Sequence, residues 1–418
     1  MKTTKLYIYV LAGLLLFASC KPTIQTPKAS RGTADFSRFI AIGNSLTAGY
    51  ADGGLYLEGQ LNSYPSIMAN QMLSVGGGSF TQPLFSTAQA NGSGYLQLTG
   101  FNADGSPITS AVTSNLAIRG ILAVPNFGNV TLYTKYTGDI NNYGVPGIKL
   151  LNITYAPYGN LNGFFERMLP GDAPTNTTDY LDFVTAKSFT FFSDWLGNND
   201  ALAYATGGGV GDVLTDKTVF AELYELSIEK LTASGQKGVL GTIPDVTSIT
   251  YFNTVTIGAI LAGVQKANPS VQALYVNALV SGTTYAPRVA TANDLVILTF
   301  PTSMIGTLVT TPYGPLPYGL TPYTPIDNQY VLDANEVALT RDYVQSYNAT
   351  IKSIAAQKGL AVFDAYTYLN NVKANGLVVD GISLRLTQRS DIEGFLTQHN
   401  DRVQALTDAI RKQTTHAD

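Results

Sequence analysis

One serine in this sequence stands where a nucleophile could be presented. Ser45 follows the apolar run 36–42, with only Gly43 and Asn44 between them. Such a run predicts a buried strand that ends in a turn. A tight turn after a strand can expose a serine hydroxyl at the edge of a sheet, and glycine permits the backbone angles that this turn needs. A nucleophilic serine also needs a general base and an oxyanion hole, without which the segment would be an ordinary Ser-Gly turn.

Two further polar turns follow segments with strand character. The first runs over 142–147 and ends in Pro-Gly, after Tyr and Thr residues in a strand-like pattern over 131–143. The second, Gly-Asn-Asn-Asp at 197–200, follows the β-prone run 188–196. Taken singly, these segments would be a Pro-Gly turn and an Asx turn or helix cap. In parallel α/β sheets functional residues lie at the carboxyl ends of the strands, so the three turns together indicate a site at that edge.

In this order, the three turns resemble the first three sequence blocks of the SGNH (GDSL) serine ester hydrolases. The segment 43–46, Gly-Asn-Ser-Leu, looks like the first block with Asn in place of the usual Asp. The resemblance implies that Ser45 is the nucleophile, and that its N–H forms an oxyanion hole with the N–H of Gly147 and the side chain of Asn199. An asparagine in that role contributes about 3 kcal/mol of transition-state stabilisation. The resemblance covers residues 36–380, loosely in the insertions.

The last block of that family, Asp-x-x-His, is absent from this sequence. In the family its histidine is the general base for the serine, and its aspartate orients the histidine. The chain has two histidines, of which His416 is two residues from the end. His399 is the better candidate because it stands just before an amphipathic stretch at 403–410. Asp391 or Glu393 would orient it.

Two alternatives to a catalytic histidine remain open. In the first alternative, His399 is an exposed surface residue without a catalytic role. In the second, the segment 385–418, which is more charged and polar than the chain before it, has diverged or been altered by a frameshift. A serine hydrolase without its base retains some rate from the oxyanion hole and substrate binding alone, so the second alternative predicts a weak or inactive enzyme.

The amino-terminal segment has the layout of a bacterial lipoprotein signal peptide. Lysines begin the chain, an apolar run occupies 6–17, and small residues precede Cys20, the only cysteine. The run is too short to span a membrane, which takes about 20 apolar residues. The segment 17–20, Phe-Ala-Ser-Cys, resembles a lipobox and implies cleavage of residues 1–19 and lipidation of Cys20; the alternative is an ordinary signal peptide. Residues 20–34 are then a polar tether to the membrane of the bacterial cell envelope.

Composition narrows the function classes. Of the 418 residues, 45% are hydrophobic and 13% are charged, which suits a large core and argues against disorder. The formal net charge of −4 and the lack of a Lys/Arg cluster argue against a nucleic-acid partner. A single cysteine excludes an intramolecular disulfide and a metal site built on cysteines. No metal or organic cofactor is implied.

The remaining patterns predict one α/β domain over 35–418. We expect a mostly parallel sheet with helices on both faces, which the family resemblance makes an SGNH-like three-layer sandwich. Two stretches, near 75–135 and 281–330, predict large loop insertions: residues 75–118 lack a sustained period and allow short strands, and 281–330 is rich in Tyr, Pro, Thr and Gly. Helices are expected at 66–73, 161–168, 219–234 and 335–357, and further strands at 238–243 and 360–363.

The expected activity is hydrolysis of a carboxylic ester through an acyl-serine intermediate. The substrate is either a lipid-like acyl ester, as for an esterase or lipase, or an acetyl ester on a glycan, and the membrane is met through the lipid anchor. The alternative is a catalytically degenerate lipoprotein that keeps the fold and binds a ligand without turnover. The missing Asp-x-x-His favours this alternative, whereas the three intact blocks oppose it.

Overall fold

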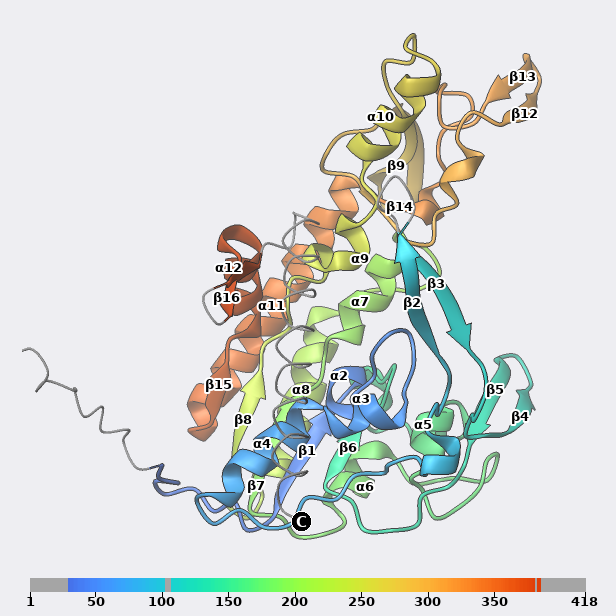
Figure 1. Cartoon of the computed structure of the whole chain (residues 1–418). Helices are drawn as coiled ribbons and strands as arrows, with labels where there is room; N and C mark the ends of the chain where they lie inside the picture. Colours follow the sequence, from blue (N-terminus) through green and yellow to red (C-terminus); the bar gives the residue numbers. More distant parts are fainter. Residues whose placement is uncertain (1–28, 102–106, 380–381, 385–418) are drawn as a thin grey trace, which may run out of the picture.

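A computed structural model describes residues 29–101, 107–379 and 382–384 of the chain. The expected signal peptide, Cys20, Asp391 and His399 lie outside the described residues. A parallel five-stranded sheet forms the centre of the molecule (Figure 1). Its spatial order is β15 (Ala361–Phe363), β8 (Lys237–Gly241), β7 (Phe191–Trp195), β1 (Phe39–Gly43) and β6 (Asn142–Gly144).

The strand order reverses next to β1. The chain passes from β1 to β6 on one side, then crosses to β7 on the other side and continues outward to β8 and β15. Doubly wound sheets bind their ligands at the carboxyl ends of the strands, where the order reverses. The fold therefore points to the carboxyl ends of β1, β6 and β7, which are the strands that carry the three polar turns.

The two faces of the sheet are covered by different helices because successive side chains of a strand point to opposite faces. On β1, Ile40 and Ile42 belong to the main core with α8 (Lys217–Leu231) and α11 (Ala334–Lys358). Phe39 and Ala41 pack on the other face against α4 (Tyr64–Leu73). The ring of Phe220 on α8 stacks on Tyr347 of α11, with centroids 3.9 Å apart, and both rings are buried. Each such side chain stabilises the fold by about 1.5–3 kcal/mol.

Most of the expected regular elements are confirmed, with ends displaced by a few residues. The expected helix over 161–168 is present as α5 (Gly163–Glu166). The structure also contains helices that the patterns did not predict: α2 (Ser45–Ala48), α3 (Leu57–Leu61), α6 (Tyr180–Thr185), α7 (Asn199–Thr206), α9 (Thr250–Asn253), α10 (Ile257–Ala267) and α12 (Ala365–Asn375). None of the described helices is long and apolar enough to cross a membrane.

The first insertion contains two antiparallel hairpins, in agreement with the short strands that its sequence allowed. The strands β2 (Tyr95–Phe101) and β3 (Pro107–Val112) form one, and β4 (Ile118–Val124) and β5 (Gly128–Tyr133) the other. The expected continuous strand over 131–143 is therefore wrong: its first residues end β5, and β6 begins only at Asn142. Glu166 of α5 holds the second hairpin in place, because its buried carboxylate pairs with Arg119 at 2.6 Å and Lys135 at 3.0 Å.

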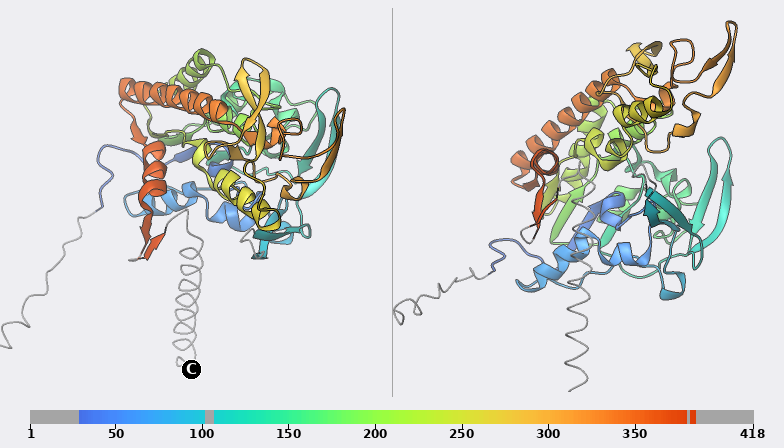
Figure 2. Two further views of the ribbon diagram at one scale, coloured as in Figure 1. Left: turned by 90° about the horizontal axis from the view of Figure 1, so that it is seen from above. Right: turned by 45° about the horizontal axis from the view of Figure 1, so that its top comes forward.

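The second insertion also contains regular structure, which corrects the expectation of a loop over 281–330. It lies between β8 and α11 and forms a lobe beyond the carboxyl ends of the central strands, and hairpin β2–β3 extends toward it (Figures 1 and 2). Short sheets pair within the lobe: β9 (Tyr275–Ser281) with β10 (Thr284–Val289), β11 (Leu295–Val296) with β14 (Val331–Leu332), and β12 (Leu308–Thr311) with β13 (Gly314–Pro317). A last small hairpin, β16 (Leu377–Val379) with β17 (Ile382–Leu384), follows α12.

Candidate active site

The three polar turns leave the sheet side by side. The strand register places Gly43 at the end of β1 directly beside Gly144 of β6 and Trp195 of β7. Neighbouring strands of a sheet lie about 4.8 Å apart. Because each turn begins within a few residues of this aligned row, the structure brings Ser45, Gly147 and Asn199 to one short stretch of the same sheet edge.

Ser45 is the first residue of helix α2. The Asn44 side chain caps this helix, since its Oδ1 accepts a hydrogen bond from the Leu46 N–H at 3.1 Å. Ser45 is half-buried. Among the described residues, its N–H has no hydrogen-bond acceptor. The serine therefore presents both a hydroxyl and an unpaired N–H at the positive end of a short helix.

Helix α2 lies unusually close to β6, which fixes the serine relative to the second turn. The Asn142 side chain donates to the Thr47 carbonyl at 2.8 Å, and Val145 N–H donates to the Gly43 carbonyl at 3.0 Å. A Cβ on Gly144 would collide with the backbone of Ala48. Only glycine at position 144 permits this approach of helix to strand.

Gly147 lies in the second turn with a backbone that favours glycine. Its φ is +85°, the residue is exposed, and its N–H has no acceptor among the described residues. The turn is held by Asn162, which caps α5 and whose Nδ2 donates to the Pro146 carbonyl at 2.9 Å. The N–H of Gly147 is therefore available to a ligand and is backed by a fixed loop.

Asn199 begins helix α7 and reaches across to the second turn. Its side chain is buried, and Nδ2 donates to the Ile148 carbonyl at 2.8 Å. A primary amide carries two donor hydrogens, so one remains for another acceptor. Because the amide is planar, the hydrogen bond to Ile148 also fixes the direction in which the second N–H of Asn199 can donate.

Asp200, the last residue of the Gly-Asn-Asn-Asp segment, positions the neighbouring loop, a role that the sequence analysis did not predict. Its buried carboxylate accepts from the Leu150 N–H, at 3.0 Å to Oδ2, and from the Thr215 hydroxyl at 2.7 Å. Burial raises the pKa of Asp200 to about 6, against the opposing effect of these hydrogen bonds. Asp200 thus ties the loop that follows Gly147 to the start of α7. Its place beside Asn199 in the Gly-Asn-Asn-Asp segment was the available signal.

Several buried amide groups at this edge lack partners. Both polar atoms of the Asn198 side chain and Nδ2 of Asn44 are buried and make no hydrogen bond to the described residues. Buried polar atoms are nearly always paired with protein, water or ligand. Their concentration in the turns after β1 and β7 adds to the polar character of the site.

A histidine base is not found among the described residues, because both histidines of the chain, His399 and His416, lie outside them. Asp364 follows β15, at the carboxyl end of the last central strand, and its carboxylate is hydrogen-bonded to other residues. Although burial opposes it, hydrogen bonds from Lys352 at 2.7 Å and from Thr367 lower the pKa of Asp364 to about 2. A carboxylate of that pKa is a poor general base near neutral pH.

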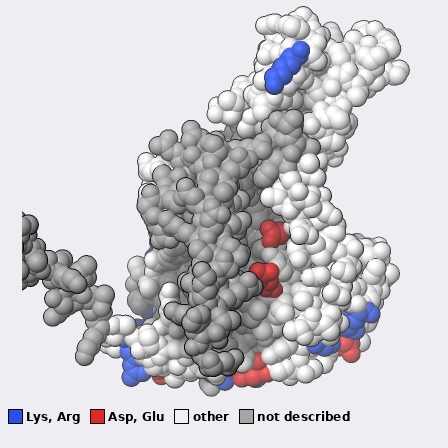
Figure 3. Space-filling model, viewed as in Figure 1, with Lys and Arg blue, Asp and Glu red and all other residues white. Residues whose placement is uncertain are grey.

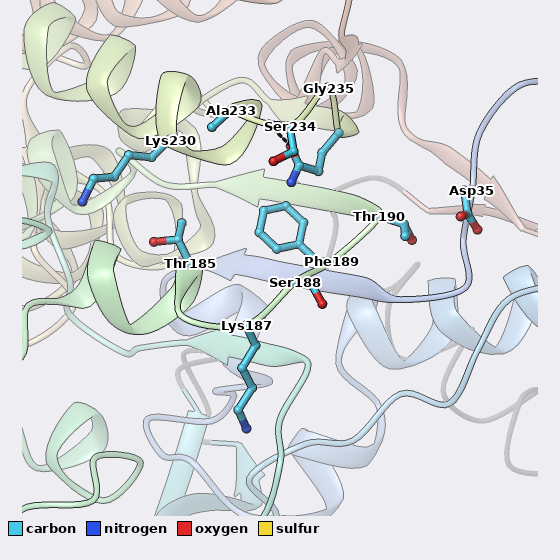
Figure 4. Close-up of a pocket in the computed structure, with 11 residues that line it drawn as sticks. Asp35, Thr185, Lys187, Ser188, Phe189, Thr190, Lys230, Ala233, Ser234 and Gly235 are labelled. Atoms are coloured by element: carbon cyan, nitrogen blue, oxygen red, sulfur yellow. Dashed lines mark hydrogen bonds between the residues drawn. The ribbon is translucent and has the colours of Figure 1, made fainter.

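A large cavity of about 630 Å³ lies at the opposite edge of the sheet, before the amino ends of β7 and β8 (Figure 4). Its two lysines are occupied: Lys187 pairs with Asp139 and Lys230 with Asp182, each at 2.5 Å. No hydroxyl of its lining is hydrogen-bonded to Asp35 or to either lysine, so no nucleophile is paired with a base there. This cavity therefore does not compete with the carboxyl-end site.

Comparison with known proteins identifies no family for this chain. No model of a known protein family matches the chain, and a search of curated proteins finds no match.

Proposed function

We propose that this protein is a serine ester hydrolase of the SGNH type. The observation that carries the proposal is the meeting of three turns at one sheet edge: Ser45 and Gly147 with unpaired N–H groups among the described residues, and Asn199 with a spare amide hydrogen. Three convergent donors beside a serine hydroxyl are what a tetrahedral oxyanion requires. The order reversal of the sheet at β1 supports the same location.

In the proposed reaction, the Ser45 hydroxyl attacks the ester carbonyl carbon. The carbonyl oxygen becomes an oxyanion and accepts hydrogen bonds from the N–H groups of Ser45 and Gly147 and from the Asn199 amide. The base takes the serine proton and passes it to the leaving alcohol, and water then hydrolyses the acyl-serine. We propose His399 as that base and Asp391 as the acid that orients it, both of which lie outside the described residues.

We also propose that Cys20 carries a lipid that anchors the protein in the cell envelope, through a tether that ends near residue 34. Labelling of the expressed protein with a fatty-acid analogue tests this proposal. Label in the natural chain and none in Cys20→Ser would support it. Equal label in both would exclude Cys20 as the site.

The hydrolase proposal is tested by covalent labelling and by turnover. A soluble form that starts after Cys20 would be treated with a fluorophosphonate, digested and analysed by mass spectrometry, and assayed on 4-nitrophenyl esters. We expect the fluorophosphonate adduct on Ser45. In Ser45→Ala, both the adduct and the hydrolysis of 4-nitrophenyl esters should be lost. Ser66→Ala, which removes a half-buried serine of α4, is the matched control. His399→Ala should keep the fold and lose turnover.

The second candidate is a ligand-binding protein with the hydrolase fold. It is favoured by one observation, the absence of Asp-x-x-His from the sequence. No adduct and no turnover on any acyl or acetyl ester would select it. Labelling of Ser45 with normal turnover in His399→Ala would instead keep the hydrolase and exclude His399 as the base.

A further inference from the structure

A pocket of about 370 Å³ opens beside helix α2, on the side of helix α3. Its size falls within the range of small-molecule sites, about 300–1,000 Å³. Leu46 and Gly49 of the α2 segment line one wall, so the pocket begins at the residue next to Ser45 and continues one helical turn further. The rest of the wall comes from the loop before α3, from α3 and from the start of α4.

Three tyrosines give the pocket fixed aromatic walls. Their hydroxyls are used within the protein: Tyr50 donates to the Gly53 carbonyl at 2.6 Å, Tyr56 to Asp52 at 2.6 Å, and Tyr64 lies 3.1 Å from the Thr47 hydroxyl. The Tyr56 ring also stacks on Tyr95, with centroids 4.2 Å apart. With the hydroxyls engaged and the rings held, these residues offer ring surface to a ligand.

The lining of the same pocket includes hydrogen-bond acceptors but no basic side chain. Glu58 and Asn62 both line it and both are exposed. The Asn62 amide donates back to the Glu58 backbone carbonyl at 3.0 Å, which leaves the Asn62 side-chain oxygen and the Glu58 carboxylate facing solvent without partners among the described residues. No lysine or arginine is among the lining residues.

On the face shown in Figure 3, acidic side chains lie near the middle and at the lower edge, whereas basic ones lie at the lower edge and at the top. A carboxylate in the pocket would repel a phosphate or a fatty-acid anion, and it would remain undersolvated against an acyl chain. Hydroxyl groups, in contrast, donate strong hydrogen bonds to a carboxylate.

We propose that this pocket binds a neutral sugar ring of the substrate, so that the ester cleaved at Ser45 is an acylated glycan rather than a lipid ester. The rings of Tyr50, Tyr56 and Tyr64 would pack on the apolar faces of the sugar, and Glu58 and Asn62 would accept hydrogen bonds from its hydroxyls. This assignment of substrate class rests on the proposed hydrolase function, but the pocket can be tested without turnover.

The first test is binding, measured in the Ser45→Ala protein so that catalysis does not matter. The single tryptophan of the chain, Trp195, packs edge-on against Tyr64 with centroids 5.5 Å apart, so its fluorescence reports on the pocket. The protein would be titrated with xylotriose, mannotriose and N-acetylchitotriose, and separately with decanoate. We expect a saturable change with at least one of the sugars and none with decanoate.

Substitution of the acceptor makes the test specific. Glu58→Gln in the same background should weaken sugar binding roughly tenfold, because a charge-assisted hydrogen bond is lost. Glu225→Gln, an exposed glutamate on α8, is the matched control and should bind as its parent does. No response to any of the three sugars, a response to decanoate alone, or equal binding by both glutamate variants would overturn the proposal.

A second test separates this inference from the hydrolase proposal. In the natural protein, kcat/KM would be compared for an acetylated xylo-oligosaccharide and 4-nitrophenyl acetate, and we expect Glu58→Gln to lower the ratio of the two. Sugar binding without any ester hydrolysis would refute the hydrolase and keep the sugar site. Hydrolysis with an unchanged ratio in Glu58→Gln would keep the hydrolase and refute the sugar site.

Discussion

The side-chain amide of Asn199 donates a hydrogen bond of 2.8 Å to the backbone carbonyl of Ile148. This bond joins the turn after β7 to the turn after β6 across the position of β1, which lies between the two strands. It holds the Asn199 amide in one orientation with its second hydrogen free. The bond thus fixes the turns after β6 and β7, on either side of the strand that leads to Ser45.

Replacement of Asn199 should impair the reaction far more than the fold. We expect Asn199→Ala to lower kcat for ester hydrolysis by about 100- to 1,000-fold, the usual effect of removing an oxyanion-hole donor. The lost hydrogen bond should cost about 1 kcal/mol of stability. Asn199→Asp should lose at least as much rate, because a carboxylate cannot donate. Asn70→Ala, an exposed position on α4, serves as control, and a rate loss matched by unfolding in thermal melts would contradict the assignment.

Gly144, at the end of β6, should tolerate alanine far less well than Gly147, in the turn that follows. Gly147→Ala places a Cβ in ordinary van der Waals contact, 3.7 Å from Nδ2 of Asn162, so only its backbone conformation, worth about 1–2 kcal/mol, is disfavoured. Gly144→Ala would drive a Cβ into the backbone of Ala48. We expect folded Gly147→Ala protein with reduced kcat, and poorly folded Gly144→Ala protein. Comparable melting temperatures for the two variants would show that the contact with α2 is looser than described.

Asp200 should matter through the loop that it holds. Asp200→Ala leaves the buried Leu150 N–H and the Thr215 hydroxyl without their acceptor, which costs about 1–3 kcal/mol for each unsatisfied group. Because the loop carries Gly147, kcat should fall while KM changes little. Asp200→Asn keeps one acceptor oxygen and should restore most of the rate, which a simple charge effect would not allow. Urea unfolding and steady-state kinetics on both variants measure the two quantities.

Asp194 should make the protein less stable as the pH rises. Burial raises the pKa of its carboxyl from 3.8 to about 7, and the carboxyl lies beside β1 with one oxygen unpaired among the described residues. The folded state therefore holds this proton more tightly than the unfolded state. The associated stability is complete below about pH 4 and is lost as the pH rises through about 7, a loss on the order of 4 kcal/mol.

The amide variant Asp194→Asn isolates this effect. It keeps the acceptor for the Leu196 N–H at 3.1 Å and cannot ionise. Asp200 and Glu336, whose pKa values burial also raises, remain in both proteins, so only the difference between the variants counts. From pH 5 to pH 8, we expect the free energy of unfolding in urea to fall further in the natural protein than in Asp194→Asn. The same pH slope in both proteins would exclude Asp194 as the source.

Several elements could be predicted from the sequence because their signals are local. The apolar run before Ser45, the β-prone run before the Gly-Asn-Asn-Asp segment and the long helix 335–357 each appear within three residues of their expected ends. The ends and the pairing of the hairpins in the insertions could not be predicted in this way. Most of their residues are exposed or half-exposed, and Gly, Thr and Pro interrupt the strands, so no alternating pattern stands out.

The sequence by itself determined which groups are available: one serine, one glycine and one asparagine in turns after strands, two late histidines and a single cysteine. Only the tertiary structure decided that Gly43, Gly144 and Trp195 stand in one row, that Asn199 reaches Ile148, and that Asp200 holds the loop between them. The pocket of tyrosines beside Ser45 also exists only in the folded chain. The physical reason is that strand register and hydrogen bonds between turns depend on residues some 50 to 150 positions apart, whereas turn and strand propensities act over a few neighbours.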